Sequence, residues 1–182
     1  WEYVGLLYES SSEKVKALSA KVQGFRFCEC PDFFPLDGKH VILSTHAPHT
    51  YWQLGEYKNH RLEPQGFGIM DGGGFCSAKT LIDDKGRRIA IGFLWSHWGW
   101  FSTPTPEQVA EGFAGVLSLP RELHVLPDNT LGIEPVEELN QLRGKHVRLE
   151  HLSFTADEAT RFMLENISGD SLELRLEFEP SN

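Results

Sequence analysis

Glu29 is the residue of this sequence whose surroundings point most directly to chemistry. It lies in the segment FCECPDFFPL, which spans residues 27–36. Residues 25–30 alternate as in a β-strand, so Phe25, Phe27 and Glu29 are expected on one face, and Pro31 is expected to end the strand. Burial beside phenylalanines disfavours the charged form of a carboxylic acid, as a general acid requires. The same pattern also fits a glutamate at a strand end whose carboxylate reaches water or an arginine.

The three cysteines, Cys28, Cys30 and Cys76, do not form a metal-binding pattern. One residue separates the first two, and neither a second cysteine pair nor an HxxxH motif accompanies them, so we expect no metal and no cofactor. The same short spacing disfavours a disulfide, and free thiols favour a reducing, cytoplasmic location. His46 and His49 can approach each other in a loop, which is more typical of a surface pair than of a metal site.

The composition is that of an acidic globular protein. The chain has 182 residues, of which 40% are hydrophobic and 24% are charged. Its 17 basic and 26 acidic residues give a formal net charge of −9 at pH 7. No basic cluster offers a surface for phosphates, and the apolar runs are too short to span a bilayer, so we expect neither a nucleic acid nor a membrane as partner. A neutral sugar is compatible with such a surface.

Short apolar runs between turn signals predict an all-β fold. The runs lie at residues 40–43, 51–54, 80–82 and 89–91, and glycine-containing turn signals lie at residues 38–39, 55 and 84–86. Evenly spaced short strands suit a sandwich or a propeller, and turns rich in glycine and aromatic residues are typical of propeller blades.

Helix signals are confined to three segments. Residues 11–22 begin with a serine that can cap a helix and continue with apolar residues at helical spacing. Residues 106–116 are expected to form a turn or two of helix. Residues 134–144 have a proline in the first turn, acidic residues early and a glycine at the end, which predicts a third helix.

The segment around Glu29 resembles an enzyme signature. The string ECPDFFPLDGKHVILS, residues 29–44, is similar to the acid/base signature of glycoside hydrolase family 32, which includes invertases, sucrose-6-phosphate hydrolases, inulinases and levanases. Further similar motifs follow in the family's order, at residues 71–75, 78–80, 84–89, 112–115 and 118–123.

The resemblance implies a five-bladed β-propeller followed by a β-sandwich. Residues 1–133 would form about three blades. Residues 134–145 would be the linker helix, and residues 146–182 would supply the first strands of the sandwich. The alternation of leucines with charged residues at positions 172–178 agrees with a half-buried strand there.

The resemblance also implies hydrolysis of β-fructofuranosides by a retaining mechanism, with Glu29 as the general acid/base. The family's nucleophilic and transition-state-stabilising aspartates belong to Asp-Pro and Arg-Asp-Pro motifs, and this sequence has no Asp-Pro and no Arg-Asp dipeptide. We therefore expect the chain to be the carboxy-terminal part of such an enzyme and to be inactive by itself. A non-catalytic carbohydrate-binding or remnant propeller fragment and a fructosyltransferase are the alternatives.

Four further residues are candidates for binding the fructoside, namely Cys30, Asp32, Asp71 and Phe93. Asp32 either orients the Glu29 segment or caps a turn. Asp71, in an Asp-Gly turn, either reaches the substrate rim or belongs to an ordinary hairpin. Phe93 stands where the family has tryptophan, and Cys76 stands where it usually has tyrosine.

Several arginines and tryptophans of the sequence have possible structural roles. We interpret Arg87, Arg88 and Arg121 as structural residues that pair between blades. Three tryptophans lie close together in the sequence, Trp95, Trp98 and Trp100. They either offer stacking faces for sugar rings or fill gaps between blades.

Overall fold

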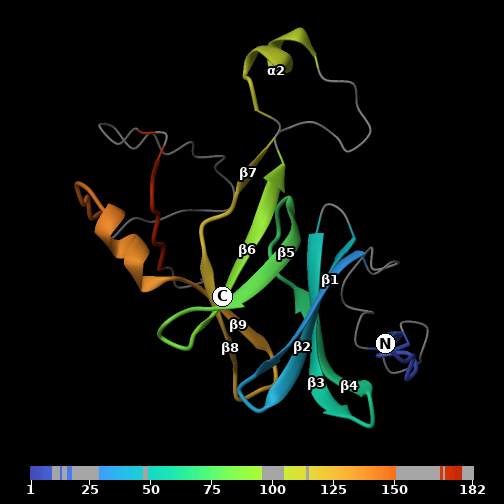
Figure 1. The fold of residues 1–182 in the computed structure, drawn as a ribbon. Coiled ribbons are helices and arrows are strands. Elements are labelled where there is room, and N and C mark those ends of the chain that lie inside the picture. The colour runs from blue at the N-terminus through green and yellow to red at the C-terminus, as the bar shows by residue number, and fades with distance from the viewer. Residues whose placement is uncertain are drawn as a thin grey trace, which may run out of the picture. The chain divides into compact units, whose positions relative to one another are not determined.

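The computed structural model of this chain describes residues 1–9, 13, 16–17, 29–46, 49–95, 105–113, 115–150, 169 and 171–177. The chain divides into two compact units, Trp1–Val136 and Glu137–Asn182. All the described strands belong to the first unit (Figure 1). None of the helices found among the described residues is long and apolar enough to cross a membrane.

The first sheet is a four-stranded antiparallel meander in the order β1-β2-β3-β4. Its strands are β1 (Glu29–Leu36), β2 (Lys39–His46), β3 (His49–Lys58) and β4 (Arg61–Ile69). Asp37 and Gly38, with φ of 47° and 76°, form the two-residue turn between β1 and β2. Positive φ at both positions matches the right-handed twist of the flanking strands, which is why Asp-Gly is favoured there.

The second sheet is also antiparallel, in the order β5-β6-β8-β9. Its strands are β5 (Phe75–Ile82), β6 (Arg88–Trp95), β8 (Arg121–Val125) and β9 (Leu131–Pro135). The short strand β7 (Gly115–Leu117) pairs with β6, and the helix α2 (Pro106–Ala110) precedes it in the chain. The predicted turn of helix within residues 106–116 is therefore confirmed.

The two sheets share one apolar core. Alternate residues of the first sheet point to the same side, and those facing the core include Val41, Leu43 and Leu54, all with 0% exposure. They pack in one cluster with Phe75 and Ala90 of the second sheet. Burial of these side chains is the main stabilising term available to the two sheets.

The strand that carries Glu29 differs from the sequence prediction. We expected a strand that Pro31 ends, but β1 begins at Glu29 and continues through Pro31 to Leu36. Pro31 is accommodated because β1 is an edge strand with an irregular register between Glu29 and Asp32. Edges and bulges are the places where the missing N–H of proline costs the sheet no ladder hydrogen bond.

The predicted helix at residues 134–144 is shorter than expected. Glu134 and Pro135 pair with β8 as the end of β9, and the helical segment is a 3₁₀ helix, η1 (Glu137–Leu142). Pairing with a neighbouring strand therefore prevails over the local helix signal at its first residues. Of the helix predicted at residues 11–22, positions 13, 16 and 17 are helical, and the other positions lie outside the described residues.

The predicted start of a β-sandwich in residues 146–182 is not shown. Residues 172–177 belong to no helix and no strand, and Leu172, Leu174 and Leu176 are 68%, 71% and 73% exposed. An alternating segment becomes a half-buried strand only when a partner strand pairs with its edge and another layer covers its apolar face. The described residues of the second unit supply neither. Phe178 lies outside the described residues.

Candidate active site

Glu29 is an exposed residue at the first position of β1. It pairs in register with Thr45 of β2. The sequence left two interpretations open, and the exposed position of Glu29 contradicts burial beside two phenylalanines and fits a glutamate at a strand end whose carboxylate reaches water. Phe25 and Phe27 lie outside the described residues. The reason for the exposure is topological, because the first residue of an edge strand has a neighbouring strand on one side only.

A bulge immediately follows Glu29. Three steps of β1, from Glu29 to Asp32, match two steps of β2, from Thr45 to Leu43. The extra residue is accommodated by Cys30, whose φ of 47° lies in the left-handed region. Bulges of this kind re-aim side chains, and residues other than glycine are uncommon at positive φ.

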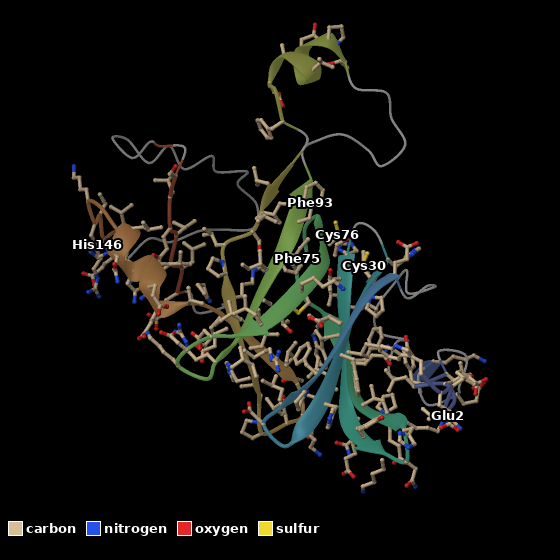
Figure 2. The ribbon with its side chains drawn as sticks, viewed as in Figure 1. Glu2, Cys30, Phe75, Cys76, Phe93 and His146 are labelled. Atoms are coloured by element: carbon tan, nitrogen blue, oxygen red, sulfur yellow. The ribbon has the colours of Figure 1, made fainter. Side chains whose placement is uncertain are left out.

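A second bulge lies in β5, against the first. The register of β5 with β6 shifts between Cys76 and Lys79, and Ser77 has a φ of 51°. The Ser77 hydroxyl donates to the Cys30 sulfur at 3.6 Å, and the Ser77 N–H donates to the Thr45 hydroxyl at 2.8 Å. The left-handed residues of the two bulges are thus in direct contact. Figure 2 labels Cys30 and Cys76, which are the second residues of β1 and β5.

Asp32 connects the first sheet to the second. Its carboxylate accepts a hydrogen bond of 2.7 Å from the backbone N–H of Thr80. The two residues are 48 positions apart, so the contact anchors the Glu29 segment to β5 and is not a local turn cap. This geometry favours the orienting interpretation of Asp32.

Lys79 holds the backbone between Glu29 and Asp32. Its ammonium group donates to the carbonyl oxygens of Cys30 at 3.0 Å and of Pro31 at 2.8 Å. Lys79 belongs to one of the motifs that resemble the family, at residues 78–80, but the sequence predicted no role for it. The only signal available was that motif, because the contact partners lie almost fifty residues away.

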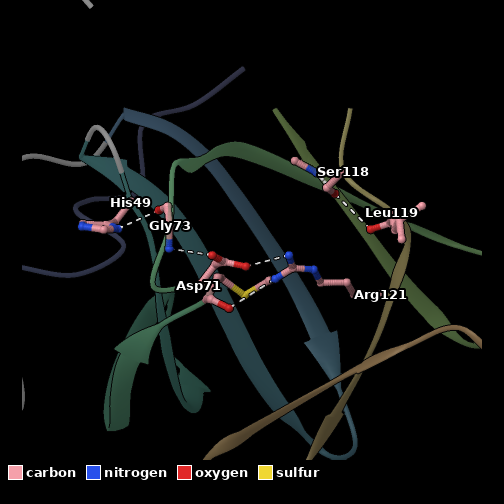
Figure 3. A network of polar contacts seen from close by, with 8 residues as sticks. His49, Asp71, Gly73, Ser118, Leu119 and Arg121 are labelled. Atoms are coloured by element: carbon pink, nitrogen blue, oxygen red, sulfur yellow. Dashed lines mark hydrogen bonds and ion pairs between the residues drawn. The ribbon is translucent and has the colours of Figure 1, made fainter. Parts of the chain in front are cut away.

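Asp71 lies in the connection between the two sheets and is held by Arg121 of β8 (Figure 3). One carboxylate oxygen contacts the guanidinium at 2.6 Å, and the other accepts the Gly73 N–H at 2.7 Å. Partial burial alone would raise the pKa of Asp71. The hydrogen bond from Gly73 and the pairing with Arg121 outweigh burial, so the pKa of Asp71 lies below its ordinary value.

Arg121 makes further contacts that fit its predicted structural role. Its guanidinium lies over the Phe75 ring, 4.5 Å from the centroid, and is 3.5 Å from the Met70 carbonyl oxygen. Arg88 similarly lies over the Phe34 ring of β1, at 4.7 Å. Both arginines therefore lie between segments of different strands, as cations against aromatic faces.

Phe93 and Cys76 face each other across β5 and β6. Cys76 is 1% exposed, and its thiol lies 3.6 Å from the Phe93 carbonyl oxygen. The Phe93 ring packs so closely on Gly115 that a Cβ at that glycine would lie 2.4 Å from it. The half-buried Phe93 is thus part of the packing between β6 and β7, and its label in Figure 2 lies close to that of Cys76.

The histidine pair occupies the turn end of β2 and β3. His46 and His49 are paired in register, and His49 Nδ1 is 3.1 Å from the Gly73 carbonyl oxygen. In the part of the chain that the structure describes, no group of three histidine, cysteine or carboxylate side chains could hold a metal ion. Cys30 and Cys76 form no disulfide, whereas Cys28, Trp98 and Trp100 lie outside the described residues.

The structure thus brings together Glu29, Cys30 and Asp32 at one anchored bulge, while Asp71 and Phe93 have separate contacts. A family model matches the part of the chain that forms these two sheets. The model of the "Glycosyl hydrolases family 32 N-terminal domain" matches residues 5–135. This chain belongs to glycoside hydrolase family 32.

The match also corrects one expectation. The matched region is the family's N-terminal, propeller domain, so the expectation of a carboxy-terminal fragment is wrong. The two antiparallel sheets are consistent with partial blades of that propeller.

Curated relatives are about 30% identical to this family 32 chain over the aligned residues. An insoluble isoenzyme of β-fructofuranosidase from Arabidopsis thaliana is 29% identical, over 85% of this chain and 30% of the relative. A sucrose-6-phosphate hydrolase from Vibrio alginolyticus is 32% identical, over 81% of this chain and 33% of the relative. The chain therefore spans about a third of the length of these relatives.

Solved structures agree with the assignment. A glycoside hydrolase family 32 structure from Bifidobacterium adolescentis matches with a TM-score of 0.50 and 28% identity, over 63% of this chain and 19% of that chain. A sucrose-6-phosphate hydrolase from Lactobacillus gasseri matches with a TM-score of 0.50 at 17% identity, over 64% of this chain and 26% of that chain, which shows the fold alone.

Proposed function

We propose that this chain supplies the general acid/base of an enzyme that hydrolyses β-fructofuranosides with retention. The observation that supports the proposal is the placement of Glu29. Its exposed side chain directly precedes a bulge whose backbone is anchored to the second sheet by Asp32 and Lys79. A carboxyl group that is open to solvent but attached to a fixed backbone can meet a substrate in one reproducible geometry.

In this proposal Glu29 acts twice. It first donates its proton to the glycosidic oxygen as the bond to the anomeric carbon breaks, while a second carboxylate attacks that carbon. Glu29 then accepts a proton from the water that cleaves the covalent fructosyl intermediate. The nucleophile's motif is not part of this sequence. The paired Asp71 is not assigned to that role, because Arg121 and Gly73 occupy its oxygens.

The other candidate residues support binding of the fructoside. Cys30 and Asp32 follow the reacting carboxyl and hold its segment. The lone pairs of Asp71 that Arg121 and Gly73 leave open can accept from sugar hydroxyls, and Phe93 offers an apolar wall. We also propose that residues 1–133 are propeller, residues 134–145 a linker and residues 146–182 the start of a second domain. The substrate class follows from family membership, since the names of relatives include β-fructofuranosidase and sucrose-6-phosphate hydrolase.

The test uses a chimera in which this chain replaces the corresponding third of the Vibrio alginolyticus relative. Glu29→Gln should lower the turnover of sucrose or sucrose phosphate on the order of 10²–10⁴-fold, because proton transfer is lost in both steps. Fructosyl fluoride needs no protonation of its leaving group and should lose much less in the first step.

The matched control is Glu63→Gln, an exposed glutamate on the other edge strand of the same sheet. It should leave turnover unchanged. Equal losses for sucrose and fructosyl fluoride in the Glu29→Gln chimera would show that Glu29 is not the acid.

One observation favours a second candidate, a carbohydrate-binding protein without catalysis. The sequence carries the acid/base motif without the nucleophile motif. Calorimetric titration of the chain with fructose oligomers would detect such binding. In this alternative Asp71→Asn weakens binding and Glu29→Gln does not.

A further inference from the structure

We propose that Lys79 is a positioning residue for Glu29, through the two backbone carbonyls that it holds in the bulge of β1. The inference rests on the proposed function of Glu29 as the acid. Lys79 does not touch the reacting atoms in this proposal. It fixes the segment from which the Glu29 side chain projects.

The bulge creates a need for the lysine. A bulge interrupts the ladder, so some of its backbone groups lose their partners on the neighbouring strand. Backbone carbonyls without partners are costly when substrate or neighbouring strands exclude water. Lys79 Nζ donates to the Cys30 and Pro31 carbonyl oxygens at 3.0 and 2.8 Å, which are the two residues between Glu29 and Asp32.

Lysine suits this task because of its chemistry. An ammonium group carries three donors and no acceptor, so one side chain can serve two carbonyls at once. Lys79 comes from the far side of the second bulge, whose register shift ends at Lys79. The Thr80 N–H, one residue on, binds the Asp32 carboxylate at 2.7 Å. Successive residues of β5 therefore hold three successive residues of β1.

The strained backbone gives this anchoring a function. Cys30 has a φ of 47°, which a residue other than glycine adopts only when its surroundings impose it. Without the lysine, the Cys30 and Pro31 peptides can relax and change the direction of the preceding Glu29 side chain. A displacement of about 1 Å in a catalytic group can cost on the order of 10²-fold in rate.

Hydrogen exchange on the full chain tests the anchoring directly. Lys79→Met keeps the length of the side chain and removes its donors. The amides of Glu29, Cys30 and Asp32 should exchange on the order of tenfold faster, because their local opening becomes easier. Lys79→Arg, which keeps donors, should restore most of the protection.

The matched control is Lys39→Met. Lys39 is also a strand lysine, and its ammonium group donates to Gln65 at 2.7 Å, at the opposite end of β1. It should leave exchange at residues 29–32 unchanged. If Lys79→Met leaves that exchange unchanged as well, the proposal is overturned.

The chimera described above tests the catalytic consequence. Lys79→Met should lower kcat for sucrose by about 10-fold to 10²-fold with KM unchanged, and lower it much less for fructosyl fluoride. If Lys79 had a merely structural role, Lys79→Met would lower kcat equally for both substrates and would reduce the melting temperature. That result would overturn the proposal.

The same variants distinguish failure of the Glu29 assignment from failure of the positioning role of Lys79. If Glu29→Gln leaves sucrose turnover unchanged, the assignment of the acid falls whatever Lys79→Met does to exchange. If Glu29→Gln has its expected effect but Lys79→Met has none on either exchange or kcat, only the positioning role falls.

Discussion

Two regions of this chain carry alternating apolar residues, and only one of them builds a sheet from them. In β2, Val41 and Leu43 are completely buried, and strands on both sides pair with the backbone. In the second unit, Leu172 and Leu174 are also two positions apart, with Glu173 between them where β2 has Ile42, but they are 68% and 71% exposed. Alternation determines which side chains can share a face. Partner strands and a covering layer determine whether that face is buried.

The ion pairs of the two units also differ in how far they are shielded from solvent. In the first unit the pair between Asp71 and Arg121 connects the loop before β5 with β8 and is about three-quarters shielded from solvent. In the second unit Arg143 pairs with Glu173 at 2.5 Å, with both side chains more than 40% exposed. An ion pair gains more where neighbouring atoms exclude water, so the first should contribute more to stability.

The largest expected effect compares two leucines. Leu43→Ala removes a side chain with 0% exposure from the shared core and should lower the free energy of unfolding by about 2–5 kcal/mol. Leu174→Ala removes an exposed side chain and should change it by less than about 0.5 kcal/mol. Urea denaturation of the full chain measures both. Equal destabilisation would show that Leu174 is buried in solution.

Two glycines make the next comparison. A Cβ at Gly92 would lie 2.5 Å from the Phe75 ring, whereas a Cβ at Gly144 meets nothing within 4 Å. Gly92→Ala should therefore destabilise the chain by about 1–3 kcal/mol through overpacking. Gly144→Ala should have no measurable effect. If Gly92→Ala is also neutral in thermal unfolding, the Phe75 ring can move aside and the core is looser than its packing indicates.

A smaller effect is expected at Asp71. The pKa of its carboxyl is lowered in the folded chain, so its stabilisation is fully present above the unfolded pKa of about 3.9 and is lost as pH falls through the lower folded value. Asp71→Asn should cost about 1–2 kcal/mol at pH 7, between the values for exposed and buried pairs. The difference between variant and parent should shrink as the pH drops below about 4.

The control for Asp71 is Asp84→Asn, in the turn between β5 and β6. Asp84→Asn should leave the free energy of unfolding at pH 7 unchanged, because Asp84 lies in an exposed turn. If Asp71→Asn destabilises the chain by the same amount at pH 7 and below about pH 4, the carboxylate acts through its shape and not through its charge.

The smallest expected effect is at Glu173. Hydrogen bonds from Arg143 lower its pKa to about 2, and Arg175 contributes further. Stability from this pair would be present above the ordinary carboxyl pKa and lost only as pH falls through about 2. Arg143→Met should raise the pKa of Glu173, as carbon-13 NMR titration would measure, with no detectable change in unfolding. A clear loss of stability at pH 7 would contradict the contrast between the two units.

Local sequence patterns predicted parts of four strands of the first unit, β2, β3, β5 and β6, and the order of the motifs predicted the family. Residues 41–43 and 51–54 are buried strand residues, as their apolar runs predicted, and the Asp37-Gly38 turn joins β1 to β2. These features depend on neighbours along the chain, since alternation, turn residues and motif order can all be read locally. The family followed from the order of short motifs, and the match over residues 5–135 confirms it.

Only the tertiary structure decided how the Glu29 segment is held. Pro31 lies within β1 because the edge strand bulges there, and Lys79 and Thr80 reach that bulge from residues 48 or 49 positions away. The leucines at 172–176 depend on tertiary partners as well, because they stay exposed where no strand pairs with their segment. Local propensities are small compared with the energies of burial and pairing, and those energies depend on partners that fold topology brings together from distant parts of the chain.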